Sequence, residues 1–569
     1  MRGERVRAIR ARLAAAMPDL APDHVAAVAA ALGLSIADDD LPEVVHRLNG
    51  FLDAFETLGA VAGDGPDVPW PIPVAPAAAP GRGPAPAATP PAVTPPAGAA
   101  DLAHLPAARQ AELLRARALS PVDLVRAYLE RIERLDGRLR SYITVRADEA
   151  LAEARGAEAE QARGAWRGPL HGIPFAVKDQ FDTAGLRTTA GSRLFADRVP
   201  AADATVVARL REGGAILLGK LNLSELAMGD TVEFPFGQPR NPWSLEHHPG
   251  SSSGGSGAAT AAGLCAFSLG EDTAGSIRGP AAYCGLVGLR PTWGRLSRAG
   301  CMPLAWSLDA PGPITRTVED CAIVYEATAG HDPADVTSRR EPVAPCRPGL
   351  DAGVRGLRLG VVRELVESPD TDAEVRDAVA AAARALAGAG ATVDEVSLPL
   401  APLAGAVSMA LADAEGAGLY REALRARPRD LDRNTRRRLL AASLLPAALH
   451  HRARQARAAV RAEVAAALAR VDVLLAPASP RPAPRIADGA APITSKAAAA
   501  GRFFIRRAYN TPASLAGLPA LSVPCGLSAA GLPIGLQAIG RALDEATLLR
   551  VARAVEQACG WPRRPPFDG

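Results

Sequence analysis

The sequence predicts an α/β fold with a large, mostly buried mixed β-sheet flanked by helices, preceded by a small all-helical domain at the N-terminus. Two observations support this prediction. Between residues 101 and 569, short apolar runs alternate with helical stretches, as in a sheet covered by helices. The chain has 569 residues, of which 48% are hydrophobic, so it can bury a large core.

The N-terminal part of the chain divides into a helical domain and a linker. Helical spacing of apolar residues is seen at Val44, Leu48, Phe51, Phe55 and Leu58. Between residues 66 and 96, 12 of 31 residues are prolines, and this composition favours an extended polyproline conformation over a packed core. We therefore predict a helical domain over 1–62, a linker over 63–100 and a main domain over 101–569.

Within the main domain, local patterns place the first helix and five strands. Ser120 is a typical N-cap residue, Pro121 suits the first helical position and Asp123 adds a favourable charge, so a helix is expected to follow. The strand candidates are the apolar runs 173–179, 215–220, 357–362, 471–477 and 519–526. The Ala-, Arg- and Leu-rich stretch 366–470 is predicted to be mostly helical and to cover one side of the sheet.

Composition and charge argue against several classes of function. A formal net charge of +3 gives no nucleic-acid-binding footprint, and no apolar run reaches the length of about 18 residues that indicates a membrane span. The seven cysteines form no CxxC pair, and the histidines at 247–248 and 450–451 lack the helical spacing of metal ligands. The N-terminus also lacks the apolar region of a signal peptide. We therefore expect a cytoplasmic protein with no metal or cofactor and no nucleic-acid or membrane partner.

The stretch PGSSSGGS at residues 249–256 concentrates serines among glycines and admits several interpretations. A phosphate-binding loop is excluded, because its GxxxxGK[ST] pattern requires a lysine that this stretch lacks. The GxSxG pattern of a nucleophile elbow fits residues 250–254, but the preceding NPWSLEHHP is unlike the strand that such an elbow follows. Local composition alone does not distinguish a linker from a catalytic loop.

Three separated motifs taken together indicate a catalytic loop. They are GIPFAVKD with Lys178, the loop PGSSSGGSGAATAAG with Ser252, and GEDTAGSIRGPAAYCGLVGLRPT with Ser276. With flanking segments such as GKLNLSELAMG and GLPIGLQAIGR, they resemble the amidase signature family in order and spacing over roughly residues 105–567. The resemblance implies the amidase signature fold and a Ser-Ser-Lys triad, in which Lys178 is the base, Ser252 the bridging serine and Ser276 the nucleophile.

The chemistry of such a triad explains the residue types. A serine needs a base, and lysine serves only when neutral, so the apolar run 173–177 before Lys178 is expected to desolvate the lysine and lower its pKa. Ser252 can relay the proton, because a hydroxyl both donates and accepts. Asp179 is expected to orient Lys178, and Lys220 to support the structure. Backbone N–H groups that can stabilise the oxyanion are expected from Thr273, Ala274, Gly275 and Ser276.

The resemblance also implies a cis peptide bond between Ser251 and Ser252. It assigns supporting roles to Ser253, Asp272 and Arg278. One position departs from the family pattern, because Ala274 stands where the family usually has glycine. Alanine would be strained there if the position needed a positive φ, and would otherwise only narrow the pocket, which is the alternative we favour.

The predicted function is cleavage of a small-molecule carboxylic acid amide to acid and ammonia through an acyl-enzyme. The N-terminal helices resemble those of some bacterial enantioselective amidases, and also small helical subunits that pair with amidases, so we expect a homodimer or a shielding role. Three alternatives remain open. The protein could be an ammonia-supplying subunit of an amidotransferase complex, an acyl-transferring biosynthetic amidase-like enzyme, or a catalytically silent interaction protein.

Overall fold

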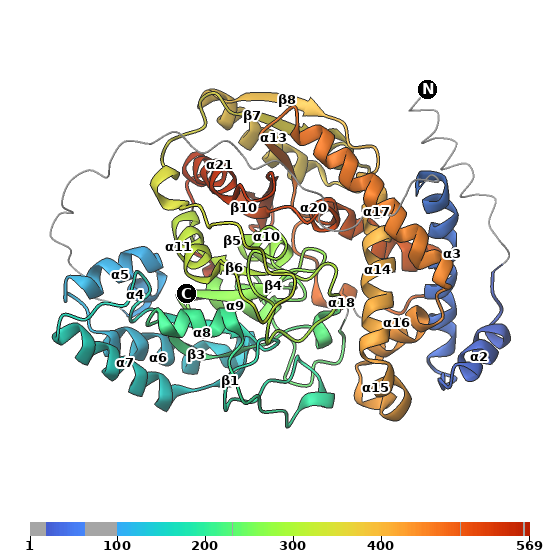
Figure 1. The fold of residues 1–569 in the computed structure, drawn as a ribbon, viewed down its shortest axis with the longest axis horizontal. Coiled ribbons are helices and arrows are strands. Elements are labelled where there is room, and N and C mark those ends of the chain that lie inside the picture. Colours follow the sequence, from blue (N-terminus) through green and yellow to red (C-terminus); the bar gives the residue numbers. More distant parts are fainter. Residues whose placement is uncertain (1–18, 63–98, 230, 490, 562–563, 569) are drawn as a thin grey trace.

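The computed structural model describes residues 19–62, 99–229, 231–489, 491–561 and 564–568 (Figure 1). The linker prediction therefore falls almost entirely outside the described residues, as does the first part of the predicted helical domain. Among the described helices, none is both long and apolar enough to cross a bilayer. All seven cysteines lie in the described part of the chain, where they are free thiols, six of them buried.

The core of the fold is one mixed sheet of 11 strands in the order β1-β3-β2-β4-β6-β5-β10-β11-β9-β7-β8. The five predicted strands are all confirmed: β2 (Pro174–Lys178), β3 (Ile216–Leu221), β7 (Arg358–Val362), β9 (Val473–Pro477) and β10 (Ala520–Leu527). The strands that the pattern missed are β1 (Tyr142–Val145), β4 (Phe267–Glu271), β5 (Val287–Arg290), β6 (Pro311–Thr315), β8 (Thr392–Val396) and β11 (Pro533–Ile539). Strand β2 runs parallel to β3 and β4, whereas β10 and β11 are antiparallel. The predicted α/β class with a large mixed sheet is therefore confirmed.

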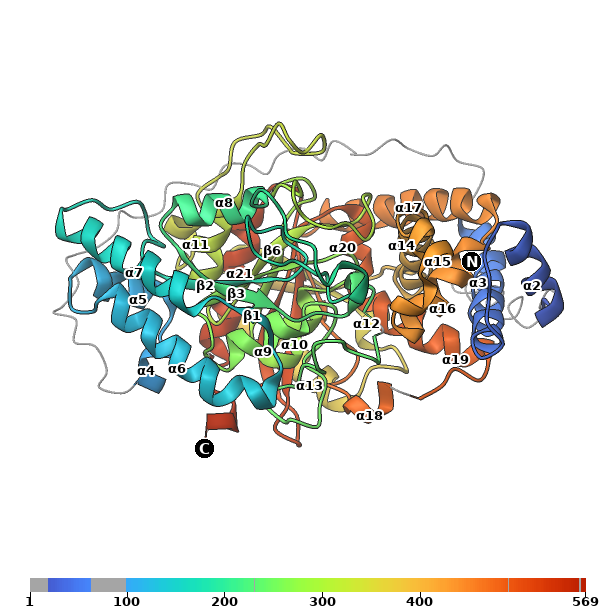
Figure 2. The same cartoon turned by 90° about the horizontal axis from the view of Figure 1, so that it is seen from below.

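Helices cover both faces and both ends of this sheet (Figures 1 and 2). In the first half of the chain they are α2 (Pro22–Ala31), α3 (Leu41–Ala62), α4 (Ala99–His104), α5 (Ala107–Arg115), α6 (Pro121–Leu139), α7 (Ala147–Ala162), α8 (Thr205–Glu212), α9 (Gly254–Ala261) and α10 (Arg278–Cys284). In the second half they are α11 (Val318–Thr328), α12 (Arg363–Val366), α13 (Ala373–Gly388), α14 (Ala404–Leu419), α15 (Arg421–Ala426), α16 (Arg433–Ser443), α17 (Ala447–Leu468), α18 (Ile486–Gly489), α19 (Lys496–Ala500), α20 (Thr511–Ala516) and α21 (Glu545–Ala558). Helix α6 begins where Ser120 predicts it, and the Ser120 Oγ accepts a hydrogen bond from the Val122 N–H at 3.0 Å.

The stretch 366–470 is mostly helical, as predicted, but only part of it covers the sheet. Helix α13 packs on the sheet, whereas α14, α16 and α17 pack mainly on one another and on α3 at one end of the molecule (Figure 1). The reason lies in α14, whose residues 404–413 are all buried, so that this helix has neighbours on every side instead of one sheet-facing stripe.

The N-terminal helices α2 and α3 are docked firmly on this helical layer. Their apolar side chains, Val44 and Leu48 among them, belong to the same buried cluster as residues of α14, α16 and α17. Asp40, which is 1% exposed, accepts hydrogen bonds from Arg436 Nε at 2.6 Å and Arg437 Nε at 2.8 Å. Apolar packing and buried ion pairs therefore act together at this contact.

Substituting Asp40 by alanine is expected to loosen α2 and α3. Removal of one partner from a buried ion pair costs about 3–5 kcal/mol, because the remaining charges lose their compensation. Asp40→Ala should therefore lower the thermal unfolding midpoint and speed proteolytic cleavage within residues 19–62. Asp38→Ala is the matched control, since Asp38 is exposed. Equal cleavage rates for the two variants would show that the ion pair does not hold these helices.

Candidate active site

Lys178 lies at the end of β2, where the strand runs into the centre of the molecule. The side chain is completely buried, and its Nζ donates a hydrogen bond to Ser252 Oγ at 2.8 Å. Burial lowers the pKa of Lys178 from the ordinary value of 10.5, although the Glu271 carboxylate, 3.5 Å away, opposes this effect. The expected lowering of the Lys178 pKa by burial is therefore seen, while the contribution of the apolar run 173–177 stays a prediction.

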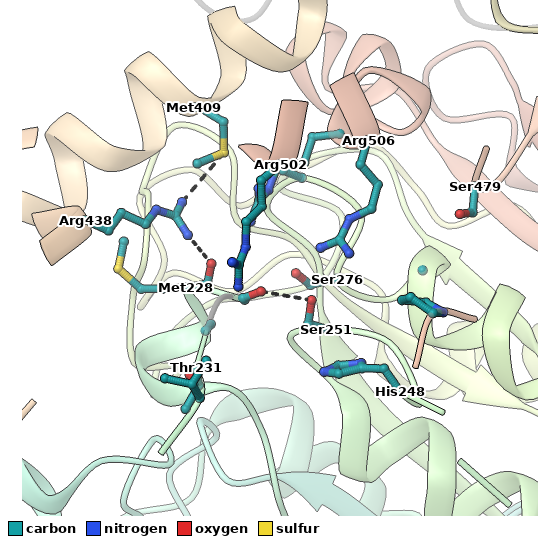
Figure 3. Close-up of a pocket in the computed structure, with 18 of the residues that line it drawn as sticks. Met228, Thr231, His248, Ser251, Ser276, Met409, Arg438, Ser479, Arg502 and Arg506 are labelled. Atoms are coloured by element: carbon teal, nitrogen blue, oxygen red, sulfur yellow. Dashed lines mark hydrogen bonds between the residues drawn. The ribbon is translucent and has the colours of Figure 1, made fainter. Parts of the chain in front are cut away.

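The loop that carries Ser252 leads directly into α9. The peptide bond between Ser251 and Ser252 is cis, as the family resemblance implied. Ser252 and Ser253 are fully buried, and Ser253 Oγ donates to the Glu271 carbonyl at 3.4 Å. Ser251 Oγ donates to the Gly229 carbonyl at 3.2 Å and lines the cavity described below (Figure 3).

Ser276 lies in the loop between β4 and α10, and Asp272 organises this loop. The Asp272 carboxylate accepts the N–H groups of Gly275 at 2.8 Å and Ile277 at 3.1 Å, and it pairs with Arg278 at 2.9 Å. Burial alone would raise the pKa of Asp272, but the adjacent guanidinium groups hold it well below its usual range. Asp272 and Arg278 therefore support the loop structurally, and Ser276 remains half-buried at the cavity wall.

The N–H groups around Ser276 are not all available to an oxyanion. Gly275, which we predicted as a donor, already donates to Asp272, so this part of the prediction needs correction. The N–H groups of Thr273, Ala274 and Ser276 have no hydrogen-bond partner in the part of the chain that the structure describes. These three N–H groups remain candidate donors.

Ala274 replaces glycine without backbone strain. Its φ is not positive, whereas Gly275 has a φ of +111°. A Cβ at Gly275 would come within 2.8 Å of the Asn510 Cβ, so the loop requires glycine at 275 and tolerates alanine at 274. Ala274 lines the cavity, which agrees with the favoured alternative.

A pair of buried carboxyl groups lies behind Lys178. Thr273 Oγ1 is 2.9 Å from Glu271 Oε1 and 2.8 Å from Asp309 Oδ1. A hydroxyl has one hydrogen, so it can donate to only one of these carboxyl groups and must accept a hydrogen bond from the protonated form of the other. Burial and the Glu271 charge raise the pKa of Asp309 well above its ordinary value, so Asp309 is the partner that more readily carries the proton.

Asp179 does not orient Lys178, contrary to our expectation. Consecutive residues of an extended strand point to opposite sides, and Asp179 lies 3.2 Å from Lys220 Nζ and accepts a hydrogen bond from Thr189 Oγ1 at 2.5 Å. Lys220 also donates to the Phe181 carbonyl at 2.7 Å. The structural role predicted for Lys220 fits these contacts, and Asp179 shares that role.

The loop of Ser276 opens onto a cavity of about 470 Å³ (Figure 3). Its walls bring together Ser251, Ser276 and His248 with Arg502 and Arg506 from a segment more than 220 residues later in the chain. Ser276 Oγ makes no hydrogen bond to Ser252 among the described residues, so the structure joins Lys178 to Ser252 but leaves Ser276 unbonded. Sequence reasoning missed the arginines, because no local pattern connects RFFIRR to the serine loops. It also gave no role to Glu271, although this residue lies within the motif GEDTAGSIRGP.

Fold, motifs and comparison with known proteins agree on the class of protein, an α/β enzyme that carries the amidase signature. The chain belongs to the amidase signature family, whose sequence profile, described as Amidase, matches residues 123–549. This assignment confirms the resemblance inferred from the three motifs.

The proteins that are similar to this chain have names that refer to different functions. The chain is 42% identical over 496 residues to a glutamyl-tRNA(Gln) amidotransferase subunit from Moorella thermoacetica, a match that covers 82% of this chain and 99% of that one. The native peptide amidase of Stenotrophomonas maltophilia superposes with a TM-score of 0.71 at 34% identity, over 82% of this chain and 99% of that structure. A protein from a vestigial complex, said to reveal the evolutionary origins of an s-triazine catabolic enzyme, superposes with a TM-score of 0.75 at 36% identity, over 81% and 99% of the two chains.

Proposed function

We propose that the protein cleaves a carboxylic acid amide by nucleophilic catalysis, with Ser276 as nucleophile, Ser252 as proton relay and Lys178 as base. The observation that carries this proposal is the 2.8 Å hydrogen bond between Lys178 Nζ and Ser252 Oγ in a fully buried site. A buried lysine with a lowered pKa can be neutral and accept a proton, which an arginine cannot do.

The reaction begins when Ser276 Oγ attacks the amide carbonyl carbon. The Ser276 proton passes to Ser252, whose own proton passes to neutral Lys178. The negative charge on the carbonyl oxygen is stabilised by N–H groups among those of Thr273, Ala274 and Ser276, and one such donor contributes about 10²- to 10³-fold in rate. The C–N bond then breaks as the leaving nitrogen takes the proton back through Ser252. Water attacks the acyl-enzyme by the same route and releases the acid.

In this mechanism Glu271 affects the pKa of the base, Lys178. Its carboxylate faces Lys178 Nζ and favours the charged lysine, while burial favours the neutral one. The Thr273 hydroxyl bridges Glu271 and Asp309. The pH at which Lys178 becomes an effective base therefore depends on the charge of Glu271.

Replacement of Glu271 by glutamine is expected to shift the pH profile towards lower pH. Catalysis needs neutral Lys178, so kcat/KM rises with pH until this lysine is deprotonated. Loss of the neighbouring negative charge lowers the pKa of Lys178 further, so the rise should occur at lower pH in Glu271→Gln than in the wild type. The measurement is kcat/KM between pH 5 and pH 10. An unchanged profile, or one displaced to higher pH, would exclude Glu271 from this role.

Two fates of the released ammonia fit this chemistry. Release to solvent makes the protein a simple amidase, which the structural similarity to a peptide amidase supports. Delivery to a second substrate makes it part of an amidotransferase, and the high similarity to proteins named as amidotransferase subunits favours this alternative. The naming of those relatives as subunits argues against the simple homodimer expected from the sequence.

The two fates are separated by substrate range and by partners. A panel of amides, from acetamide through aryl amides to glutamine, is scored by released ammonia with the purified chain alone. Turnover of several amides without a partner supports the amidase. Activity restricted to glutamine, or dependent on co-purified subunits, supports the amidotransferase. Transfer of the acyl group to hydroxylamine, without release of acid, would support the biosynthetic acyl transferase.

A further inference from the structure

Cationic side chains outnumber anionic ones in the lining of the cavity at Ser276. Five arginines line it, against a single carboxylate, Asp488. Two of these arginines have carboxylate partners, because Arg438 pairs with Asp413 and Arg485 pairs with Glu246. Arg506 differs from them, since it has neither an ion-pair nor a hydrogen-bond partner among the residues that the structure describes. Figure 3 shows Arg502 and Arg506 extending into the cavity towards Ser276 and Ser251.

His248 adds a neutral hydrogen-bond donor on the opposite wall (Figure 3). The Gly250 N–H donates to His248 Nδ1 at 2.9 Å, which leaves the ring proton on Nε2. Burial, and then the charge of Arg506, lower the pKa of His248 to about 4, so the ring is neutral near pH 7. A charged guanidinium and an imidazole N–H therefore face the same cavity. Arg506 is exposed, and among the described residues its guanidinium contacts neither a carboxylate nor a backbone carbonyl, so solvent hydrates its charge until a ligand binds.

The segment that carries Arg502 and Arg506 is held in place by the N-terminal helix α3. Phe51 packs on Phe504 with ring centroids 5.2 Å apart, and Arg47 stacks over the Phe503 ring at 4.4 Å. Lys496, at the start of α19, pairs with Asp53 at 3.0 Å. Figure 2 shows α3 beside α19 at this end of the molecule. The N-terminal helices thus brace the arginine-bearing wall of the cavity.

We propose that the substrate of this site is an amide that also carries a carboxylate, bound by Arg506 together with the Nε2–H of His248. This inference rests on the proposed function and specifies its substrate class. A neutral amide offers the guanidinium in this cavity a carbonyl acceptor but no opposite charge. A carboxylate matches its planar fork with two parallel charge-assisted hydrogen bonds. Binding of that carboxylate would hold the amide carbonyl at the Ser276 loop.

The test measures binding without turnover, by calorimetry on the Ser276→Ala variant of the full chain. The ligands are malonamate, succinamate and glutaramate, each compared with its uncharged diamide of the same length. We expect at least one acid to bind about 10-fold or more tighter than its diamide, as one charge-assisted pair allows. The preference should disappear on Arg506→Gln and survive in part in Arg506→Lys. Arg485→Gln is the matched control and should leave the preference unchanged, because Glu246 already compensates Arg485.

Each outcome decides between defined alternatives. If no acid binds more tightly than its diamide, including the case in which none binds, the substrate class is wrong. If inorganic phosphate binds to the wild-type cavity and depends on Arg506 while the acids do not, the site takes an anion of another kind and the inference also fails. Labelling of wild-type Ser276 by a fluorophosphonate is a separate measurement. It tests the proposed catalytic chemistry even if the proposed substrate class is wrong.

Discussion

The Ser276→Ala variant is expected to lose at least about 10⁴-fold in kcat on any amide that the protein cleaves, because no other group replaces the attacking oxygen. The fold should survive, since Ser276 Oγ makes no hydrogen bond in the described structure and the loop is held by Asp272. Circular dichroism and the thermal midpoint should therefore match the wild type, and ammonia release should fall to background.

Ser479→Ala is the matched control for this variant. Ser479 lines the same cavity and its hydroxyl lies 3.0 Å from the Tyr283 hydroxyl, outside the proposed triad. The activity of Ser479→Ala should stay within a few-fold of the wild-type activity. If Ser276→Ala retained substantial activity, or if both variants lost activity equally, Ser276 could not be the nucleophile.

Lys178→Arg is expected to reduce kcat/KM by about 10²- to 10⁴-fold, the usual contribution of a general base. Arginine keeps the positive charge and fills the space, but it does not give up its proton near neutral pH. The loss therefore separates the base from a merely cationic role. The measurement is kcat/KM at the pH optimum of the wild type, together with the rate of Ser276 modification by a fluorophosphonate.

The chain offers a simple control, because it has only three lysines. Lys496 pairs with Asp19 and Asp53 on the surface, so Lys496→Arg should keep both its contacts and the activity. An active Lys178→Arg variant with an unchanged pH profile would rule out the assignment of Lys178 as base.

The parts of the fold that the sequence predicts are those in which local pattern and environment agree. Strand β2 is apolar and fully buried, and α6 carries its own cap at Ser120. Strand β4 escaped prediction because its buried Ser268 and Glu271 look like loop residues in the sequence. Their polarity is satisfied only by partners outside the strand such as Thr260, 2.8 Å from Ser268, and Thr273, 2.9 Å from Glu271. Local pattern cannot reveal such pairs.

The residues of the candidate site also divide into those that the sequence could predict and those that it could not. Lys178 and Ser252 could be found because several motifs agree in order and spacing, and the structure joins them by a hydrogen bond. The sequence could not show that the Gly275 N–H is already bonded to Asp272 and so is not free to bind an oxyanion. The orientation of Asp272 depends on the whole loop. Arg506 reaches the cavity through the packing of its segment on α3, α14 and α19, so nothing near Ser276 in the sequence points to it.

In the proposed mechanism Ser276 forms the covalent bond, and Lys178 activates it through Ser252. The sharpest measurement is mass-spectrometric mapping of the residue that a fluorophosphonate, or an acyl group trapped from a cleaved amide, modifies in the full chain. We expect one adduct, on Ser276, that is absent from Ser276→Ala and forms much more slowly in Lys178→Arg. An adduct on Ser252 or on any other residue, or an amide-cleaving protein that forms no adduct, would overturn this mechanism.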